Sequence, residues 1–195
     1  MKKYEFTGET KEIKLLFRTT VLHRIRATVS FGFVKIGDLG GWIEKEENLS
    51  HEGKAWVCGD AKVWGNAEVC GDAKVCGDAK VWGNAEVCGD AEVWGNAEVC
   101  GDAEVCGDAK VFSASHVLVI GAIGSRNDFT TFYRDKDNEI TVKCGCFLGK
   151  IDRFLEKVTQ THGDSKYALV YRAAVEVAKL QIDLSGEAPK DADEE

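Results

Sequence analysis

Between Ala55 and Ala109 the chain repeats six positions: alanine, a charged residue, valine, cysteine or tryptophan, glycine, and aspartate or asparagine. Alanine and valine lie two positions apart, usually with lysine or glutamate between them, which is the period of a β-strand with its apolar side chains facing inward. Glycine with aspartate or asparagine indicates a turn, because these residues tolerate left-handed backbone. One short strand and one turn per repeat predict a climbing coil, in which each strand pairs with the strand one coil below.

This repeat resembles the hexapeptide repeat of left-handed parallel β-helix proteins, in which three hexapeptides form one triangular coil. The resemblance covers about residues 49–123. Counted in steps of six residues, Leu49 falls at an alanine position before the repeat, and Val117 and Ile123 fall at valine positions after it. The sequence departs from the family where a bulky cysteine or tryptophan follows valine. Cysteine and tryptophan positions match at separations of both two and three repeats, so the choice of three repeats per coil rests on the resemblance. It implies a mainly β protein of about four coils with a narrow, dry interior.

The flanking segments predict two caps on the coil. Residues 1–48 contain LLFRTTVLHRIRATVSF and then the turn-rich GDLGGW, which predict two or three strands in an N-terminal β cap. The β-helix is expected over 49–124. Residues 125–182 predict an α+β domain: a hairpin of FTTFYR, the turn DKDN and EITVKCGCF, then helices over 150–161 and from Asp164 or Ser165 to about Ile182. The charged residues 183–195 predict a disordered tail.

Both flanks also resemble segments of phage, prophage and bacterial hexapeptide-repeat proteins. HRIRATVSFGFVKIGDLGGWIEKEENLSHEG is similar to the segment that precedes such repeats, and TVKCGCFLGKIDRFLEKVTQTHG is similar to a domain that follows them. Several of those proteins are labelled transferases by analogy of fold. A shared fold does not establish a shared function, so that label carries little weight here.

Charge changes the picture of possible partners. The 195 residues carry 33 acids and 25 bases, a net charge of −8, and residues 55–111 hold 11 of the acids and 4 of the bases. This balance argues against direct nucleic-acid binding, which depends on lysine and arginine. No apolar run approaches the roughly 20 residues of a membrane span, and the N-terminus lacks the apolar core of a secretion signal. We therefore expect a cytoplasmic protein, in the host bacterium if phage-encoded, whose eight cysteines stay reduced.

The candidate binding residues are the columns that a coil of three repeats would create. Like charges about 4.8 Å apart repel by roughly 0.9 kcal/mol in bulk water before screening, so repeating them indicates a recognition face or cation binding. The alternative is that turn chemistry favours these residues and duplication copied them. Stacked exposed tryptophans indicate a partner surface, unless the flanks cover them. The predicted columns are Glu68, Glu86 and Glu104; Asp72, Asp90 and Asp108; Cys70, Cys88 and Cys106; and Trp64 with Trp82.

Residues suited to catalysis are few. Acyl transfer, the best-known activity of left-handed β-helix enzymes, uses a histidine base beside an inserted loop, and the coils contain no such loop. We expect His51 to pack at the first coil and His116 to lie on the solvated surface. Cys144 and Cys146, followed by His162, lack the usual zinc spacing; alternation predicts both cysteines buried on one strand face. A nucleophilic role with His162 stays open. No catalytic residue, metal or cofactor is assigned.

These observations leave three hypotheses. The first is a non-catalytic binding or scaffold protein of phage or prophage type, a homo-oligomeric trimer or dimer. In its most concrete form it is an anti-defence inhibitor that presents a rigid acidic face to a host nucleic-acid-binding or immune protein. The second is a coenzyme A-dependent hexapeptide acyltransferase that uses His51 or His116 as its base. The third is a purely structural oligomeric adaptor. None of them requires direct contact with nucleic acid or membrane.

Overall fold

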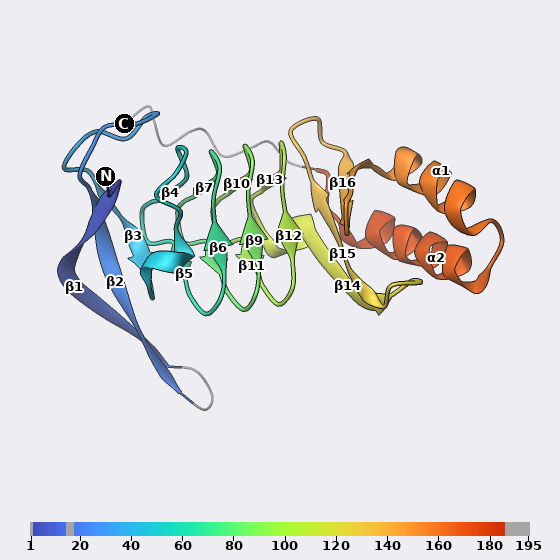
Figure 1. Ribbon diagram of the computed structural model, residues 1–195, viewed down its shortest axis with the longest axis horizontal. Coiled ribbons are helices and arrows are strands. Elements are labelled where there is room, and N and C mark those ends of the chain that lie inside the picture. The colour runs from blue at the N-terminus through green and yellow to red at the C-terminus, as the bar shows by residue number, and fades with distance from the viewer. Residues whose placement is uncertain (1, 15–17, 186–195) are drawn as a thin grey trace.

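The computed structural model describes residues 2–14 and 18–185 and shows a mainly β protein (Figure 1). A hairpin of β1 (Tyr4–Lys14) and β2 (Thr19–Ala27) lies at one end of a parallel β-solenoid of about four turns. An antiparallel sheet and two helices lie at the other end. Strand β3 (Leu39–Ile43) and a 3-10 helix (Glu46–Asn48) connect the hairpin to the coils. The N-terminal segment therefore contains three strands, where two or three were predicted.

Ten two-residue strands, each ending in valine, form the walls of the solenoid. Strands three repeats apart pair in parallel, as Lys62 with Lys80 and Val63 with Val81 do. Each coil therefore contains three repeats, and a coil of two repeats is excluded. The three walls have the strand orders β3-β5-β8-β11, β4-β7-β10-β13 and β6-β9-β12. The strands are β4 (Trp56–Val57), β5 (Lys62–Val63), β6 (Glu68–Val69), β7 (Lys74–Val75), β8 (Lys80–Val81), β9 (Glu86–Val87), β10 (Glu92–Val93), β11 (Glu98–Val99), β12 (Glu104–Val105) and β13 (Lys110–Val111).

The interior of the solenoid consists of the repeat alanines and valines, as the pattern predicts. All of them from Ala55 to Val111 are at most 1% exposed. The turns stack as closely as the walls, and this requires glycine. Gly71 has a φ of +68°, and a Cβ atom there would lie 2.9 Å from the backbone nitrogen of Gly89 in the next coil. A side chain at this position would both strain the backbone and separate the coils.

The first coil begins earlier than the repeat. Strand β3 pairs in parallel with β5, with Ile43 opposite Val63, and Leu49 bridges Val69. Leu49 therefore occupies a valine position, and the prediction that it keeps the alanine phase is wrong. From Trp56 onward, paired residues are separated by three repeats, as Trp56 and Lys74 are. Leu49 and its partner Val69 are two residues further apart than that. The segment between Leu49 and Trp56 therefore contains two residues more than the repeat would have there.

The N-terminal flank satisfies backbone groups that the first coil leaves open. The Tyr4 hydroxyl donates to the carbonyl of Leu49 at 2.9 Å, and the Asn48 amide donates to the carbonyl of Ala67 at 2.8 Å. The buried Lys3 ammonium donates to the carbonyl of Ala55 at 2.8 Å. An open coil end is a strand edge that could pair with another chain, and these contacts cover it.

The C-terminal flank is a four-stranded antiparallel sheet covered by two helices. The predicted hairpin around residues 135–138 and both predicted helices are confirmed. The six-residue phase runs through Ile123, but β14 leaves the solenoid and pairs antiparallel with β15. The second predicted hairpin strand is split by a turn at Gly145 and Cys146. The elements are β14 (Val117–Ile123), β15 (Asp128–Arg134), β16 (Ile140–Cys144), β17 (Phe147–Lys150), α1 (Ile151–His162) and α2 (Lys166–Gln181).

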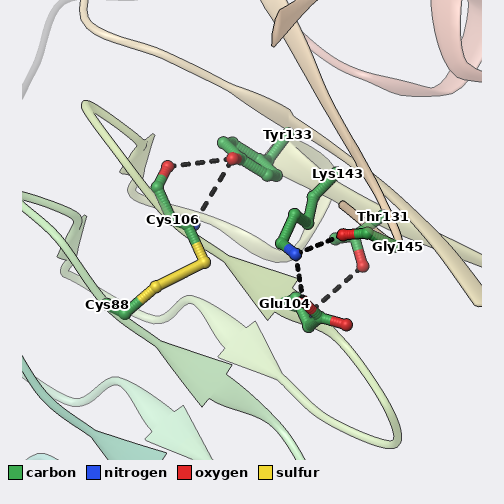
Figure 2. Close-up of a disulfide and its surroundings, with 7 residues drawn as sticks. All are labelled: Cys88, Glu104, Cys106, Thr131, Tyr133, Lys143 and Gly145. Carbon is green, nitrogen blue, oxygen red and sulfur yellow. Dashed lines mark hydrogen bonds and ion pairs between the residues drawn. A yellow bond between two sulfur atoms is a disulfide. The ribbon is translucent and has the colours of Figure 1, made fainter. Parts of the chain in front are cut away.

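Side chains of β15 seal the last coil (Figure 2). The Thr131 hydroxyl accepts a hydrogen bond from the backbone N–H of Glu104 at 3.0 Å. The Tyr133 hydroxyl accepts from the N–H of Cys106 at 3.3 Å and donates to the carbonyl of the same residue at 2.8 Å. Strand β12 has no further parallel strand beyond it, so these hydroxyls take the place of the missing coil.

Two predictions concern the remainder of the chain. Neither α1 nor α2 is both long and apolar enough to cross a membrane. The tail predicted for residues 183–195 lies outside the described residues, except for its first three. Within those three, the backbone N–H of Asp183 donates to the carbonyl of Ser115 at 3.0 Å.

Candidate functional site: an acidic face and its neighbours

One wall of the solenoid carries all six predicted acidic residues, and we call it the acidic face. On strands β6, β9 and β12, Glu68 pairs in register with Glu86, and Glu86 with Glu104. The following turns hold the second column, which consists of Asp72, Asp90 and Asp108. Backbone hydrogen bonds fix this column, since the N–H of Asp72 donates to Gly89 of the next coil at 2.8 Å. The structure therefore brings the two predicted acidic columns together.

Lysines from the two caps neutralise the ends of the acidic face. Lys54 contacts Asp72 with its ammonium group and with its backbone N–H, and both hydrogen bonds lower the pKa of Asp72. The lysines at the other end come from the C-terminal sheet. The three ion pairs are Lys54–Asp72 at 2.8 Å, Lys136–Asp108 at 2.8 Å and Lys143–Glu104 at 2.7 Å.

The centre of the acidic face keeps its charge. Among the described residues, Glu68, Glu86 and Asp90 have no ion-pair partner. The local field acts on Cys70, which lies between the two columns. Burial and the carboxylates of Glu86 and Glu68 raise the pKa of its thiol. Within the acidic face, the uncompensated negative charge therefore lies in the middle.

Two disulfides join successive coils, so the prediction that all cysteines stay reduced is wrong. Cys58 is bonded to Cys76 and Cys88 to Cys106, each pair with its Cα atoms 4.7 Å apart. Stacking of identical positions at the strand spacing places cysteines three repeats apart within the range that a disulfide needs. Cys70 stacks in the same column as Cys88, but it stays a thiol because Cys88 is already bonded to Cys106.

Two cysteines of this column and a glutamate of the neighbouring column form a possible set of metal ligands. A carboxylate oxygen of Glu86 and the sulfurs of Cys88 and Cys106 lie within 4.8 Å of one another. Three ligands fall short of the four that a structural zinc site uses. With the disulfide formed, the two sulfurs cannot act as thiolate ligands. The structure therefore gives this cluster a cross-linking role.

The two predicted tryptophans stack, and the N-terminal cap covers one of them. The rings of Trp64 and Trp82 are 5.1 Å apart and nearly parallel, at 4°. Leu22 of β2 and Trp42 of β3 pack against Trp64, which is buried, while Trp82 is half-buried. The column is therefore not an open apolar surface, and only Trp82 is available to a partner.

A groove of about 530 Å³ runs beside these rings. Lys11 and Lys14 from β1 line it together with Lys62 and Lys80 from the solenoid. Burial and the nearby Lys11 and Lys80 lower the pKa of Lys62, although Asp60 and Asp78 oppose this effect. This groove is not predicted from the sequence. The three-repeat spacing of Lys62 and Lys80 was visible, but nothing in the sequence placed β1 beside them.

Both histidines considered as catalytic bases are used for packing. His51 stacks on Tyr4 at 4.3 Å and accepts a hydrogen bond from the N–H of Lys3, which confirms its predicted packing role. His116 is buried, so its predicted surface position is wrong. It lies in a 3-10 helix (Ala114–His116) that interrupts the strand phase, and its Nδ1 accepts from the N–H of Phe112. These roles do not favour either imidazole as a general base.

The two C-terminal cysteines do not share one buried strand face, although alternation predicts that they do. Cys144 ends β16 and is half-buried, whereas Cys146 is exposed in a two-residue turn. Gly145 makes this turn with a φ of +57°. Both cysteines nevertheless line one cavity with His162, the residue that the sequence analysis left open as their partner. The C-terminal end of α1 brings His162 to this turn.

The comparisons with known proteins add no relative. No protein-family model matches the chain, and a search of the curated proteins found no match. The assignment of a β-solenoid therefore rests on the repeat and on the strand pairing described above.

Proposed function

We propose that this protein is a non-catalytic binding protein whose rigid solenoid presents the acidic face to a basic partner protein. The observation that carries the proposal is the uncompensated charge of Glu68, Glu86 and Asp90 on a wall whose spacing the backbone fixes. The backbone fixes the spacing of this surface before a partner binds, so association does not have to order the segment that carries the carboxylates. Complementary charge then favours encounter with a basic surface and disfavours acidic ones.

The spacing of the acids supports a partner that normally binds nucleic acid. Two acidic columns at a coil spacing of about 4.8 Å supply about one carboxylate per 2.4 Å of solenoid, before the lysines at the ends are counted. Duplex DNA carries one negative charge per roughly 1.7 Å of its axis. A groove lined with lysine and arginine could therefore accept this wall in place of a nucleic-acid backbone.

Several finer parts of the proposal rest on resemblance. The left-handed winding comes from the hexapeptide pattern, and the phage or prophage origin comes from the flanking segments. Together with the acidic face, they support an anti-defence inhibitor that acts in the host cytoplasm on a nucleic-acid-binding or nucleotide-signalling protein.

A variant that neutralises the centre of the acidic face tests this function. Wild type and variants are immobilised, exposed to bacterial lysate at low and high salt, and compared by quantitative mass spectrometry. We expect wild type and the control to retain a basic protein from the lysate. The acidic-face variant should retain at least about tenfold less of it, which corresponds to a loss of roughly 1.4 kcal/mol in binding free energy. The acidic-face variant is Glu68→Gln/Glu86→Gln/Asp90→Asn, and the control, with the same charge change on the other walls, is Asp78→Asn/Glu92→Gln/Glu98→Gln.

The partner is then purified, and its binding is measured across a range of salt concentrations. A charge-dominated contact weakens as ionic strength rises. Equal recovery by wild type and the acidic-face variant, or binding to the purified partner that salt does not change, would rule out the acidic face as the contact surface.

The proposal includes self-association, and α2 supplies the surface that supports it. Leu169, Val177 and Leu180 are 58%, 49% and 90% exposed and lie on one stripe of the helix. Exposed apolar side chains at this spacing are typical of a helix that packs against another protein surface. A second copy of the chain is the occupant that a homo-oligomer requires.

Light scattering after size-exclusion chromatography tests this stripe. We expect the wild type to be a dimer or trimer, and Leu169→Gln/Leu180→Gln to dissociate at least about 100-fold more readily, because two exposed leucines lose roughly 1.5 kcal/mol or more of apolar burial each. The control Glu156→Gln, at an exposed position on α1, should keep the wild-type mass. A wild type that stays monomeric at high concentration would refute self-association.

A further inference from the structure

The C-terminal domain contains a cavity that the acidic face does not involve. It has a volume of about 330 Å³ and lies where the β14–β15 turn and the β16–β17 turn meet α1 and α2. This volume is at the lower end of the range for small-molecule sites, so it suits a compact ligand and not a polymer. Polar groups line one part of it: Arg126, Cys144, Cys146, Lys157, His162 and Tyr171.

The charge of this cavity is opposite to that of the whole chain. Arg126, Lys157 and His162 line it, and no carboxylate is among the lining residues within the described chain. Arg126 and Lys157 have no ion-pair partner in the described part of the protein. In a chain of net charge −8, two unpaired cations at one cavity indicate a site for an anion.

The guanidinium of Arg126 lies close to the turn at Gly145. A Cβ atom at Gly145 would lie 2.9 Å from Nη1 of Arg126, which places the guanidinium against this turn. Burial, together with the neighbouring Cys144 and the more weakly acting Asp128, raises the pKa of Tyr171 to about 12, and Arg126 opposes this effect. Tyr171 therefore keeps its proton at neutral pH and can donate a hydrogen bond beside the guanidinium.

The rest of the cavity is apolar and aromatic. His162 stacks on Tyr171 at 5.9 Å, and Phe154 meets the Tyr171 ring edge-on at 5.5 Å. Phe147 packs against Phe154 at 5.3 Å, and both line the cavity. These rings offer flat surfaces to an apolar or aromatic body, while Arg126 lines the cavity from the β14–β15 turn and Lys157 lines it from α1.

We propose that this cavity binds a small organic anion that has a flat apolar body and one phosphate or carboxylate group. Arg126 and Lys157 hold the oxyanion, Tyr171 donates a hydrogen bond, and Phe147 and Phe154 contact the ring. Arginine suits this task because its planar guanidinium can bind both oxygens of such a group. Binding here is independent of the acidic face, so either proposal can fail without the other.

Three probes that share a naphthalene ring test the site by calorimetric titration of the full chain. 1-Naphthyl phosphate and 1-naphthoate carry the two oxyanions, and 1-naphthol is neutral. We expect one oxyanion probe to bind with a 1:1 stoichiometry and a Kd at least tenfold lower than that of 1-naphthol, and the better anion identifies the group. Equal affinity for all three probes, or no binding by any of them, would overturn the proposal.

Variants connect the affinity to the named residues. Arg126→Gln and Lys157→Gln should each weaken the preferred anion at least fivefold and leave 1-naphthol unchanged. Arg153→Gln, an exposed position on α1 outside the cavity lining, loses the same charge and should bind as the wild type does. If Arg153→Gln weakens binding as much as Arg126→Gln, the anion is attracted by overall charge and the cavity site is refuted.

A second readout does not depend on any variant. Cys146 is exposed and lines the cavity, whereas Cys100 is exposed on the solenoid. The saturating anion should slow alkylation of Cys146 by iodoacetamide at least threefold and leave the rate at Cys100 unchanged. Equal rates at Cys146 with and without the anion would place the bound probe elsewhere.

Discussion

Replacing Asp135 by asparagine lowers the free energy of unfolding by about 3 kcal/mol at pH 7, because it removes a buried carboxylate that accepts hydrogen bonds from a lysine, a hydroxyl and two backbone N–H groups. Asp135 lies just after β15 and is only 3% exposed. Its carboxylate accepts hydrogen bonds from Thr141 at 2.6 Å and from the backbone N–H groups of Asp137 and Glu139, and it forms an ion pair with Lys150. Asparagine has the same shape but lacks the charge and one acceptor oxygen.

The position of Asp135 explains why the loss affects the whole cap. Its backbone bridges Ala109 of the last coil, and the neighbouring Lys136 N–H donates to the carbonyl of Asp108 at 3.0 Å. The turn that Asp135 organises is therefore also a junction between the solenoid and the C-terminal sheet. Disordering this turn should weaken both the sheet and the closure of the coil end.

The same residue predicts how stability depends on pH. Burial alone would raise the pKa of Asp135, but hydrogen bonds from Lys150, Thr141 and two backbone amides outweigh burial and hold it below its usual value. A carboxyl group whose folded-state pKa is lowered stabilises the protein above its unfolded pKa of about 3.9. That stabilisation is lost as the pH falls through the folded-state pKa.

Urea unfolding of wild type and Asp135→Asn at pH 7, 4 and 2.5 measures both effects. The difference between the two proteins should be largest at pH 7 and should shrink toward the lowest pH. Asp137→Asn is the matched control, since Asp137 is exposed and lies 3.4 Å from the same lysine; it should cost less than about 1 kcal/mol. A constant difference at all three pH values would mean that the charge of Asp135 is not what stabilises the turn.

The repeat predicts the solenoid well because it specifies every level of the structure in the same six residues. Alanine and valine fill the interior, glycine makes the turn, and the charged residue faces outward, so local and long-range preferences agree. The stacking of Trp64 on Trp82 and the two acidic columns follow from the coil length alone. What the residues left undecided was that length, and the pairing of strands three repeats apart decides it.

The predictions fail where the repeat ends. The apolar alternation of Val117 and Ile123 suits a parallel strand and an antiparallel strand equally, and β14 adopts the second. His116 is buried because a 3-10 helix and the C-terminal sheet come after the last coil, and neither is visible in the six-residue phase. The basic groove and the C-terminal cavity each join segments that are distant in sequence, so no local pattern could reveal them.

Reducing the two disulfides is the second large effect, and the loss of each should lower the free energy of unfolding by about 3 kcal/mol. The bonded cysteines have a sequence separation of 18 in both pairs, and the chain-entropy model gives this magnitude for a loop of that length. The two segments, 58–76 and 88–106, do not overlap, so their effects should add. Cysteine stacking was expected from the coil, but composition and compartment favoured thiols, which is why the two disulfides were not predicted.

Two double variants and one control separate the contributions in urea unfolding, with and without a phosphine reductant. The variants are Cys58→Ala/Cys76→Ala and Cys88→Ala/Cys106→Ala, and the control is Cys70→Ala, which removes a thiol that is not bonded. The reductant should destabilise the wild type and the control but should have half the effect on either double variant. The mass of the intact wild type should be lower by two hydrogens per bond. An unfolding curve that the reductant leaves unchanged would show that the folded protein contains thiols.

Loss of each disulfide should also increase amide hydrogen exchange in a different part of the solenoid. Cys58–Cys76 fastens the first strand of its wall, at the N-terminal end of the solenoid, whereas Cys88–Cys106 fastens the last strand of another wall. Beyond that strand, the backbone of Cys106 is held by the hydroxyl of Tyr133. Amide hydrogen exchange at residues 104–106 should therefore accelerate in Cys88→Ala/Cys106→Ala and stay slow in Cys58→Ala/Cys76→Ala, because the two bonds fasten opposite ends of the solenoid and an end coil can open locally. Equal acceleration in both variants would mean that the solenoid opens as a single unit and that the seal by Tyr133 does not depend on the bond beneath it.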